Sequence, residues 1–252
     1  MSRQVAVSGR GAADRVRDLA ALEAQITDCR RCPRLVEWRE EVARTKRAAY
    51  AEDEYWGRPV PSFGDPEAWL LIVGLAPGAH GANRTGRMFT GDRSGDWLYG
   101  SLHAAGLASQ PSSEARDDGL VLSGAWITAV VRCAPPANRP ATAERDQCLP
   151  WLQREIPLLP SVRVVVTLGG FAWTNALRAL EVLGCAIPRP RPKFGHGAEA
   201  IVDSSSSDFI AADSLLLLGS YHPSQQNTFT GRLTREMLDG VWGRARELGA
   251  RD

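Results

Sequence analysis

The sequence predicts an α/β protein that forms a three-layer αβα sandwich around a central, mostly parallel four-stranded sheet. Two observations predict this fold class. First, four short apolar runs lack the polar alternation that marks a strand with one solvated face, so each is expected to be covered on both faces. Second, helical patterns separate these runs, and strand–helix–strand units with right-handed crossovers place helices on both sides of a parallel sheet.

The individual elements follow along the chain. The four predicted strands are Trp69–Gly74, Ala125–Val131, Val162–Leu168 and Ser214–Gly219. The six predicted helices are Asp14–Thr27, Leu35–Ala48, Ser94–Ala105, Thr142–Leu159, Phe171–Leu183 and Arg235–Leu248. Ser94 and Thr142 are expected to be N-caps, because their hydroxyls accept hydrogen bonds from the free N–H groups of a first turn. The serine run Ser204–Ser207 is expected in an exposed hairpin or loop.

Length and composition favour one domain preceded by a tail. Residues 1–13 lack the long apolar core of a secretory signal and are predicted to be a disordered tail. Residues 14–252 are expected to form a single domain, since 44% hydrophobic residues can bury a substantial core. No run of 18 apolar residues occurs, so the sequence predicts no membrane-spanning helix. We expect a monomer.

The charge of the chain is nearly balanced. A formal net charge of +1 gives no global support for nucleic-acid binding, so a surface that binds DNA must be a local basic patch. Lys46 and Lys193 are the only lysines. Arginine carries the remaining positive charge, which suits bidentate contacts to phosphate and equally fits a bias of genome composition.

Three conspicuous polar loops follow predicted strands. They are Leu75–Arg93, Arg132–Pro140 and Tyr221–Thr234. In a parallel sheet the ligand binds beyond the carboxyl ends of the strands, so we expect the three loops to share one face.

The cysteines suggest a metal site. No export signal is evident, so the thiols are expected in a reducing compartment, where metal binding is commoner than disulfides. Cys29 and Cys32 form a C-x2-C pair, and Cys133 and Cys148 form a wider one. Four thiolates can close around a [4Fe–4S] cluster or a tetrahedral zinc; the wide second pair favours the cluster. Unpaired core cysteines are the alternative, and Cys185, which has no nearby partner, is expected to be structural.

The first loop is rich in glycine. Glycines at this density let backbone N–H groups approach a ligand closely, and Phe89 offers a stacking surface beside them. The alternative for Phe89 is packing in the core. The loop is neither a P-loop nor a G-x-G-x-x-G motif.

Three segments together resemble the uracil-DNA glycosylase superfamily. They are GLAPGAHGANRTGRMFTGD in the first loop, VRCAPPAN in the second and SYHPSQQNTFTGRLT in the third. The chain is similar to family 5 in particular, the B-type enzymes of bacteria and archaea, and the matching segments span Cys29 to Thr234. The resemblance implies the αβα fold of a glycosylase. It also implies that the protein excises uracil from DNA and, as is often so in this family, other deaminated bases such as hypoxanthine. It also implies a [4Fe–4S] cluster on Cys29, Cys32, Cys133 and Cys148, and we expect a prokaryotic cytoplasmic protein associated with the nucleoid.

The resemblance also assigns a base pocket. Phe89 matches the aromatic residue that stacks on uracil, and His222 matches the histidine of the HPS motif. The residues expected to line the pocket are Ala76, Gly78, Ala79, His80, Asn83 and Phe89. The related family 4 has an acidic residue where this chain has Leu75-Ala76, and a uracil-recognising asparagine where it has Ala129. Both substitutions resemble family 5. They leave this chain without the acidic residue and the asparagine to which a catalytic and a uracil-recognising role could most easily be assigned.

Cleavage of an N-glycosidic bond leaves negative charge on the departing base while the sugar becomes oxocarbenium-like. We expect His222 to donate a hydrogen bond to a uracil oxygen, which a neutral imidazole of the right tautomer can do. Asp92 and Asn138 are candidates to orient the water. Each has a structural alternative, since Asp92 precedes a helix that it would cap and Asn138 precedes Pro140 in a potential Asx-turn. We further expect dipoles of the Gly78–Gly81 backbone to stabilise the leaving base.

The third loop is the candidate DNA contact. Ser224, Gln225 and Arg232 are expected to bind phosphates, while a side chain at the loop tip fills the space of the flipped base. The alternative is an ordinary surface loop. Four arginines that flank the other two loops are expected to complete a basic face: Arg84, Arg87, Arg132 and Arg139.

Two other function classes stay open. The absent acidic residue is compatible with a nucleic-acid-binding module that holds an iron–sulfur cluster and has weak or no catalytic activity. A zinc protein with an unrelated hydrolase activity is the second class, and it would lack the broad absorption near roughly 400 nm of an iron–sulfur cluster.

Overall fold

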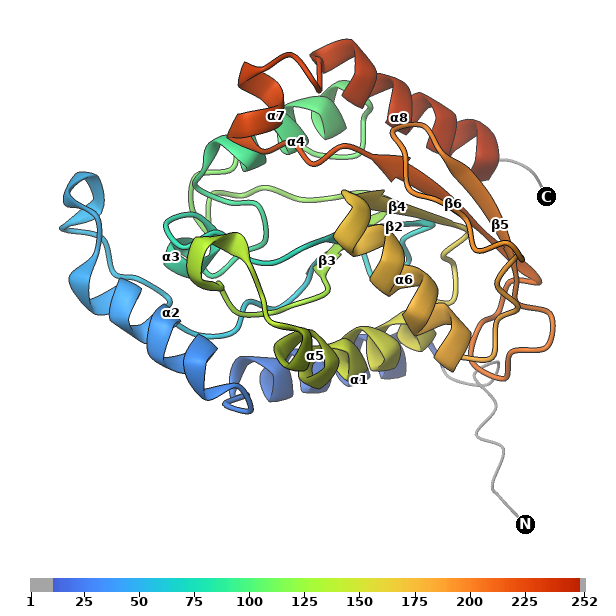
Figure 1. Cartoon of the computed structure of the whole chain (residues 1–252), viewed down its shortest axis with the longest axis horizontal. Helices are drawn as coiled ribbons and strands as arrows, with labels where there is room; N and C mark the ends of the chain where they lie inside the picture. The colour runs from blue at the N-terminus through green and yellow to red at the C-terminus, as the bar shows by residue number, and fades with distance from the viewer. Residues whose placement is uncertain (1–10, 250–252) are drawn as a thin grey trace.

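The computed structural model describes residues 11–249 (Figure 1). Most of the predicted disordered tail 1–13 lies outside the described residues. Ala12 and Ala13, however, already belong to the first helix, so the tail prediction is wrong at its end. Alanine has the highest helix propensity, which lets the helix begin before the first residue of the amphipathic pattern.

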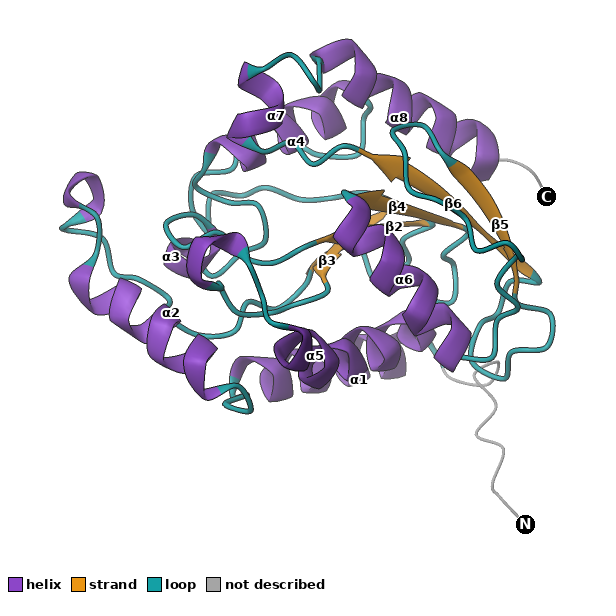
Figure 2. Cartoon of the chain, viewed as in Figure 1, coloured by secondary structure: helices purple, strands orange, loops and turns teal. Residues whose placement is uncertain are grey.

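A six-stranded mixed sheet forms the centre of the molecule (Figures 1 and 2). Its strands are β1 (Phe63–Gly64), β2 (Leu70–Gly74), β3 (Ala125–Ala129), β4 (Val164–Leu168), β5 (Glu199–Asp203) and β6 (Ser214–Ser220). Their spatial order is β1-β3-β2-β4-β6-β5. The four inner strands are parallel and coincide with the four predicted strands, whereas both edge strands pair antiparallel to their neighbours.

The helices include all six that the sequence predicts. The α-helices are α1 (Ala12–Thr27), α2 (Pro33–Thr45), α3 (Ala82–Thr85), α4 (Arg93–Ala104), α5 (Thr142–Glu155), α6 (Gly170–Val182), α7 (Gln225–Phe229) and α8 (Arg235–Gly249). Three short 3-10 turns are η2 (Ala48–Tyr50), η3 (Pro136–Asn138) and η4 (Ile156–Leu158). The two predicted N-caps are wrong by one or two positions, because α4 is capped by Asp92 and α5 by Ala141.

Successive residues of β2 show that both faces of the sheet are covered. Leu71 and Val73 pack into a core that contains residues of α1, α5 and α6. Leu70 and Ile72 point the other way, into a core that contains residues of α4 and α8. Figure 1 shows the two helical layers on opposite sides of the sheet. The predicted three-layer sandwich is therefore confirmed.

The prediction of four strands missed the two edges. Strand β5 alternates between exposed and buried residues, and β1 is only two residues long. A search for continuous apolar runs finds only strands that are buried on both faces, so an amphipathic edge escapes it. The serine run Ser204–Ser207 lies in the turn between β5 and β6, as expected. The prediction that the run is exposed is wrong at Ser204, which is buried and donates through Oγ to Ala212 O at 2.5 Å.

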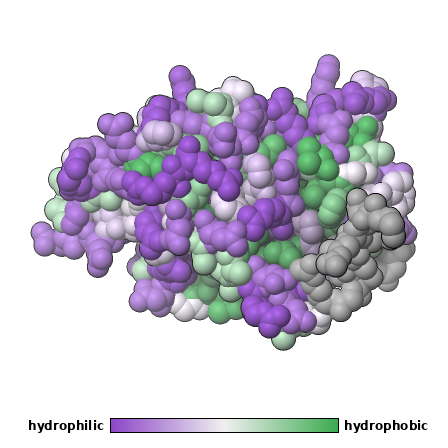
Figure 3. Space-filling view, turned by 90° about the horizontal axis from the view of Figure 1, so that it is seen from below, coloured by the Kyte–Doolittle hydropathy of each residue, from purple (hydrophilic) through white to green (hydrophobic). Residues whose placement is uncertain are grey.

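None of the helices between residues 11 and 249 is long and apolar enough to cross a membrane. The face seen from below Figure 1 is mostly hydrophilic, with small hydrophobic areas between the polar ones (Figure 3).

Candidate functional site

Three loops meet at the carboxyl ends of the parallel strands, as expected. The chain after β3 runs beside the chain after β2, because Val130 N–H donates to Gly74 O at 3.1 Å and Val131 N–H to Leu75 O at 3.0 Å. The first and third loops meet through the rings of Phe89 and His222, whose centroids lie 5.7 Å apart.

Phe89 is held in a restrained position. Its φ of 53° is in the left-handed region, which a bulky residue adopts only where the surroundings impose it. The ring lies against the end of β2, where a Cβ on Gly74 would be 3.0 Å from Phe89 Cζ. Phe89 is 9% exposed and is tilted by 33° to His222. The ring thus packs on the sheet, as the core alternative predicted, and also borders the shared face of the loops. Its stacking on a base stays a prediction.

His222 follows the last parallel strand by two residues. Burial lowers its pKa to about 4, so the imidazole is neutral at pH 7. Asn227 Nδ2 donates to the main-chain oxygen of His222 at 2.9 Å and fixes the backbone there. The His222 ring forms no hydrogen bond to another residue in the range 11–249, so both of its nitrogens are available to a ligand.

Asp92 is the N-cap of α4, and it also faces the glycine loop. Its Oδ1 accepts from Gly95 N–H at 3.1 Å, which is the capping role that the sequence offered as an alternative. A Cβ on Gly78 would lie 2.9 Å from the other oxygen, Oδ2, and a Cβ on Gly81 would overlap that oxygen. Burial is the main cause that raises the pKa of this carboxyl. One carboxylate therefore caps a helix with one oxygen and presents the other to the loop.

The remaining residues of the predicted pocket differ in their roles. Asn83 is fully buried, and its Nδ2 donates to Arg39 O at 3.2 Å and Ala79 O at 3.4 Å, so it holds the loop from behind. His80 is half-buried, and its Nδ1 lies 3.0 Å from the hydroxyl of Tyr55. Burial and two nearby arginines lower the pKa of His80. Ala76 and Gly78, like Ala79, are half-buried on the same loop.

Asn138 lies at the exposed end of the second loop. Ala137 and Asn138 have φ values of 51° and 55°, two successive left-handed residues that turn the chain sharply. Within residues 11–249 no hydrogen bond joins the Asn138 side chain to Phe89 or His222. Its assignment to the catalytic set therefore stays a prediction.

The predicted DNA contacts lie on and beside α7. Ser224 caps this short helix, its Oγ accepting from Asn227 N–H at 3.4 Å. Gln225 and Arg232 are exposed, and the guanidinium of Arg232 lies 4.6 Å from the ring centroid of Tyr221. These positions are open to a ligand, and their binding role stays a prediction.

The predicted basic face needs correction. Arg132 is 1% exposed and pairs with Glu155 at 2.6 Å, and Arg87 is 4% exposed and pairs with Asp118 at 2.7 Å. Arg84 is likewise held, by Asp53 at 2.6 Å. These three guanidiniums brace the fold, because each has a carboxylate partner that is distant in sequence. Of the four predicted arginines only Arg139 is exposed.

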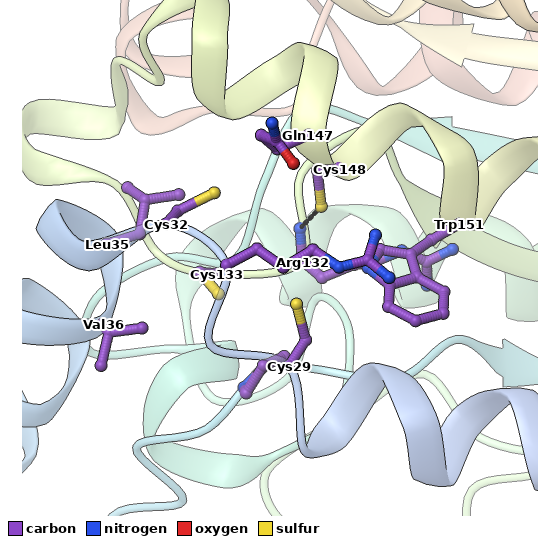
Figure 4. A pocket seen from close by; sticks show the side chains of 11 residues that line it. Cys29, Cys32, Leu35, Val36, Arg132, Cys133, Gln147, Cys148 and Trp151 are labelled. Carbon is purple, nitrogen blue, oxygen red and sulfur yellow. Dashed lines mark hydrogen bonds between the residues drawn. The ribbon is translucent and has the colours of Figure 1, made fainter.

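The four predicted cysteines surround one cavity (Figure 4). Cys29 and Cys32 come from the segment between α1 and α2, Cys133 from the second loop and Cys148 from α5. Their sulfurs face a shared space that Arg132 and Trp151 also border. Cys185 lies elsewhere, buried in the core on the α6 face, in agreement with a structural role.

The chemistry of the cavity lining fits a group that is held by thiolates. Four thiols and no carboxylate or histidine line the cavity. In the described part of the chain, no three histidine, cysteine or acidic side chains lie close enough to hold one metal ion. A tetrahedral zinc needs all four sulfurs within about 2.3 Å of a common centre, and a [4Fe–4S] cluster likewise takes four cysteine thiolates. Burial raises the pKa of Cys133 to about 11 and of Cys148 to about 12, so these thiols are protonated when free.

Comparison with known proteins shows the family of the chain. The family model of the Uracil DNA glycosylase superfamily matches residues 61–246. The chain belongs to this superfamily. Within it, the chain is 55% identical to the type-5 uracil-DNA glycosylase of Mycobacterium leprae over 228 residues, which cover 90% of this chain and 94% of that one.

Two further type-5 relatives match to a similar degree. The enzyme of Mycobacterium tuberculosis is 54% identical over 231 residues, covering 91% of this chain and 81% of the relative. The enzyme of Thermus thermophilus is 50% identical over 231 residues, which cover 92% of this chain and 98% of the relative. Membership of the type-5 group agrees with Ala76 and Ala129, the positions at which the sequence departs from family 4.

Two residues that contact the third loop or the cysteine cavity were not among the sequence predictions. His196, in the segment between α6 and β5, accepts through Nδ1 from Tyr221 N–H at 3.2 Å, one residue before His222. Arg39, inside α2, donates through Nη1 to Cys133 Sγ at 2.9 Å. Neither belongs to a motif of the three loops. For Arg39 the one signal was a charged residue on the otherwise apolar face of a helix.

Proposed function

We propose that this protein is a DNA-repair hydrolase that cleaves the N-glycosidic bond of uracil, and of other deaminated bases such as hypoxanthine, in DNA. Membership of the type-5 uracil-DNA glycosylases supports the activity on uracil. The observation that carries the mechanism is the Phe89–His222 pair, a stacking ring beside a neutral imidazole at the carboxyl edge of the sheet.

The base has to leave the DNA stack before these groups can reach it, at a cost of a few kcal/mol. Phe89 then stacks on the flipped base, and an N–H of the neutral His222 ring donates to a base oxygen. As the bond breaks, negative charge grows on that oxygen and the hydrogen bond strengthens, so the interaction favours the transition state over the ground state. A donor of this kind typically contributes about 10²–10³ in rate.

Asp92 is the proposed partner of the water. Its Oδ2 faces the Gly78–Gly81 loop while Oδ1 is fixed by the helix cap, which holds the carboxylate in one orientation. The raised pKa makes this carboxylate a better proton acceptor than a solvated aspartate. Asn138, at the end of the second loop, is proposed to contact the base or water once DNA is bound.

We further propose that Cys29, Cys32, Cys133 and Cys148 hold a [4Fe–4S] cluster. The four thiols that line one cavity and the cysteine order in the sequence support it. The cluster would tie the segment before α2 to α5 and to the second loop. Ser224, Gln225 and Arg232 are proposed to bind DNA phosphates, with Arg139 on the neighbouring loop.

The test is single-turnover excision from oligonucleotides that carry uracil, hypoxanthine or xanthine, in single and double strands. We expect release of uracil, and a loss of about 10²–10³-fold in His222→Ala. His103→Ala is the matched control, since His103 lies in the last turn of α4, away from the carboxyl edge, and should excise at the wild-type rate. A protein that binds uracil-DNA but releases none of these bases would instead be the inactive binding module.

A further inference from the structure

Arg39 is a buried cation beside the cysteine cavity. It lies in the middle of α2, and its side chain is 2% exposed. Nη1 donates to Cys133 Sγ at 2.9 Å, and both terminal nitrogens donate to Cys29 O at 3.3 Å. Its Nε is also buried and has no hydrogen-bond partner among residues 11–249. The guanidinium is therefore turned toward two of the four cysteines.

The charge of this guanidinium is poorly compensated within the described residues. Glu40 is the one carboxylate that lies within salt-bridge range, at 3.9 Å, and it is 45% exposed and also bound by Arg30. Burying a cation without a close anion is strongly unfavourable. An anionic group held by the four thiolates would supply the missing charge.

The main chain of Arg39 contacts the base-binding loop. Arg39 O accepts from Asn83 Nδ2 at 3.2 Å, and the same amide group also donates to Ala79 O at 3.4 Å. Asn83 N–H donates to Gly78 O at 3.0 Å, so this fully buried asparagine closes the turn that faces Asp92. One residue of α2 thus contacts the cysteine cavity with its side chain and the catalytic loop with its backbone.

We propose that Arg39 is a positioning residue that couples the cysteine cavity to the base-binding loop. Its guanidinium is the charge partner of the cluster, and its carbonyl holds Asn83. The inference rests on the cluster proposed above. When the cavity is filled, the guanidinium is fixed, and with it α2 and the turn Gly78–Asn83. When the cavity is empty, the buried cation gains by moving toward water, which loosens the contact to Asn83.

The first test measures how firmly the cluster is held. The purified wild type and three variants, Arg39→Met, Arg39→Lys and Arg44→Met, are exposed to an iron chelator while the absorption near roughly 400 nm is followed. Loss of a group that orients a metal ligand typically weakens metal binding about 10–100-fold, so Arg39→Met should bleach faster by a factor in this range. Arg39→Lys keeps the charge but loses the two terminal nitrogens of the guanidinium, so it should bleach at a rate between those of the wild type and Arg39→Met. Arg44→Met removes an exposed cation in the last turn of the same helix, away from the cysteines, and should bleach like the wild type.

The outcomes separate the two proposals. A wild type that purifies without iron and sulfide overturns both the cluster and this inference. A wild type that holds the cluster, with Arg39→Met bleaching at the same rate, overturns the inference alone. If Arg39→Met is insoluble, Arg39→Lys decides in the same way. None of these measurements depends on excision activity, so an inactive enzyme leaves them valid.

The second test measures the coupling itself, by amide hydrogen exchange of residues 76–85. Removing the cluster from the wild type should raise exchange there roughly tenfold, the factor that loss of one buried hydrogen bond allows. In Asn83→Ala the same amides should already exchange quickly and should not respond to removal of the cluster. Unchanged exchange in the wild type after removal would overturn the coupling.

Discussion

Replacing Glu155 with alanine leaves the guanidinium of Arg132 buried without its carboxylate. Both side chains are 1% exposed, and Arg132 Nη2 lies 2.6 Å from Glu155 Oε2. The carboxylate also accepts from Thr128 Oγ1 at 2.7 Å, from Trp126 Nε1 at 3.2 Å and from the hydroxyl of Ser62. The network joins β3 to the end of α5, and the substitution removes its centre.

The expected loss is large. Removing one partner of a buried ion pair typically costs about 3–5 kcal/mol. Each hydrogen bond to a neutral donor adds roughly 0.5–1.5 kcal/mol. Because the ion pair and the three hydrogen bonds share one carboxylate, their contributions overlap and do not simply add. We expect Glu155→Ala to lower the free energy of unfolding by about 4–6 kcal/mol, a large part of the 5–15 kcal/mol of a typical protein. Glu181→Ala, which breaks only exposed pairs with Arg189 and Arg191, should lose less than about 1 kcal/mol.

Urea unfolding followed by circular dichroism measures these differences. The double variant Arg132→Met/Glu155→Leu replaces the pair with apolar side chains and should recover much of the loss, because no unpaired charge stays buried. The argument from the buried charge is wrong if Glu155→Ala lowers the free energy of unfolding no more than Glu181→Ala does. It is also wrong if the double variant is no more stable than Glu155→Ala. Arg132 N–H also donates to Cys148 Sγ at 3.2 Å, so Glu155→Ala should weaken retention of a cluster as well.

Three further predictions concern the catalytic face. The pKa of His222 is lowered from 6.5 to about 4, so the unfolded chain binds more protons than the folded chain between these pH values. The free energy of unfolding should therefore fall as pH drops through this window, by up to about 1.4 kcal/mol per pH unit. Denaturation curves of His222→Asn should show a smaller dependence on pH. Gly81→Ala should lower the single-turnover excision rate more than it lowers the free energy of unfolding, because the added methyl group would displace Asp92. Gly240→Ala adds a methyl group in open space and should excise at the wild-type rate. Equal excision rates for the two variants would contradict this prediction. His196→Phe should lower the single-turnover excision rate about tenfold, because the N–H of Tyr221 loses its acceptor. A rate that recovers in His196→Asn but not in His196→Leu would show that His196 positions the loop through this hydrogen bond and does not act by packing alone.

Much of the fold was predictable because its signals are local. The four parallel strands are continuous apolar runs, and a run buried on both faces has no polar residues to obscure it. The edge strand β5 was missed for the opposite reason, since its alternating burial resembles that of many surface segments. The helix start at Asp92 was misplaced to Ser94 because both residue types are good caps and only the backbone shows which one is used.

The sequence by itself determined which residues could bind a base and which could hold a cluster. The motifs made Phe89, His222 and the cysteines the candidates, because each has a chemistry that few other residue types share. Tertiary structure alone decided what the charged residues do. Arg87 and Arg132 resemble phosphate ligands in the sequence, yet each meets a carboxylate 31 or 23 residues away and is buried with it. Arg39 resembles a surface arginine of a helix and instead lies buried against Cys133, 94 residues away. A charge has no fixed role until the fold determines which groups surround it and whether water reaches it.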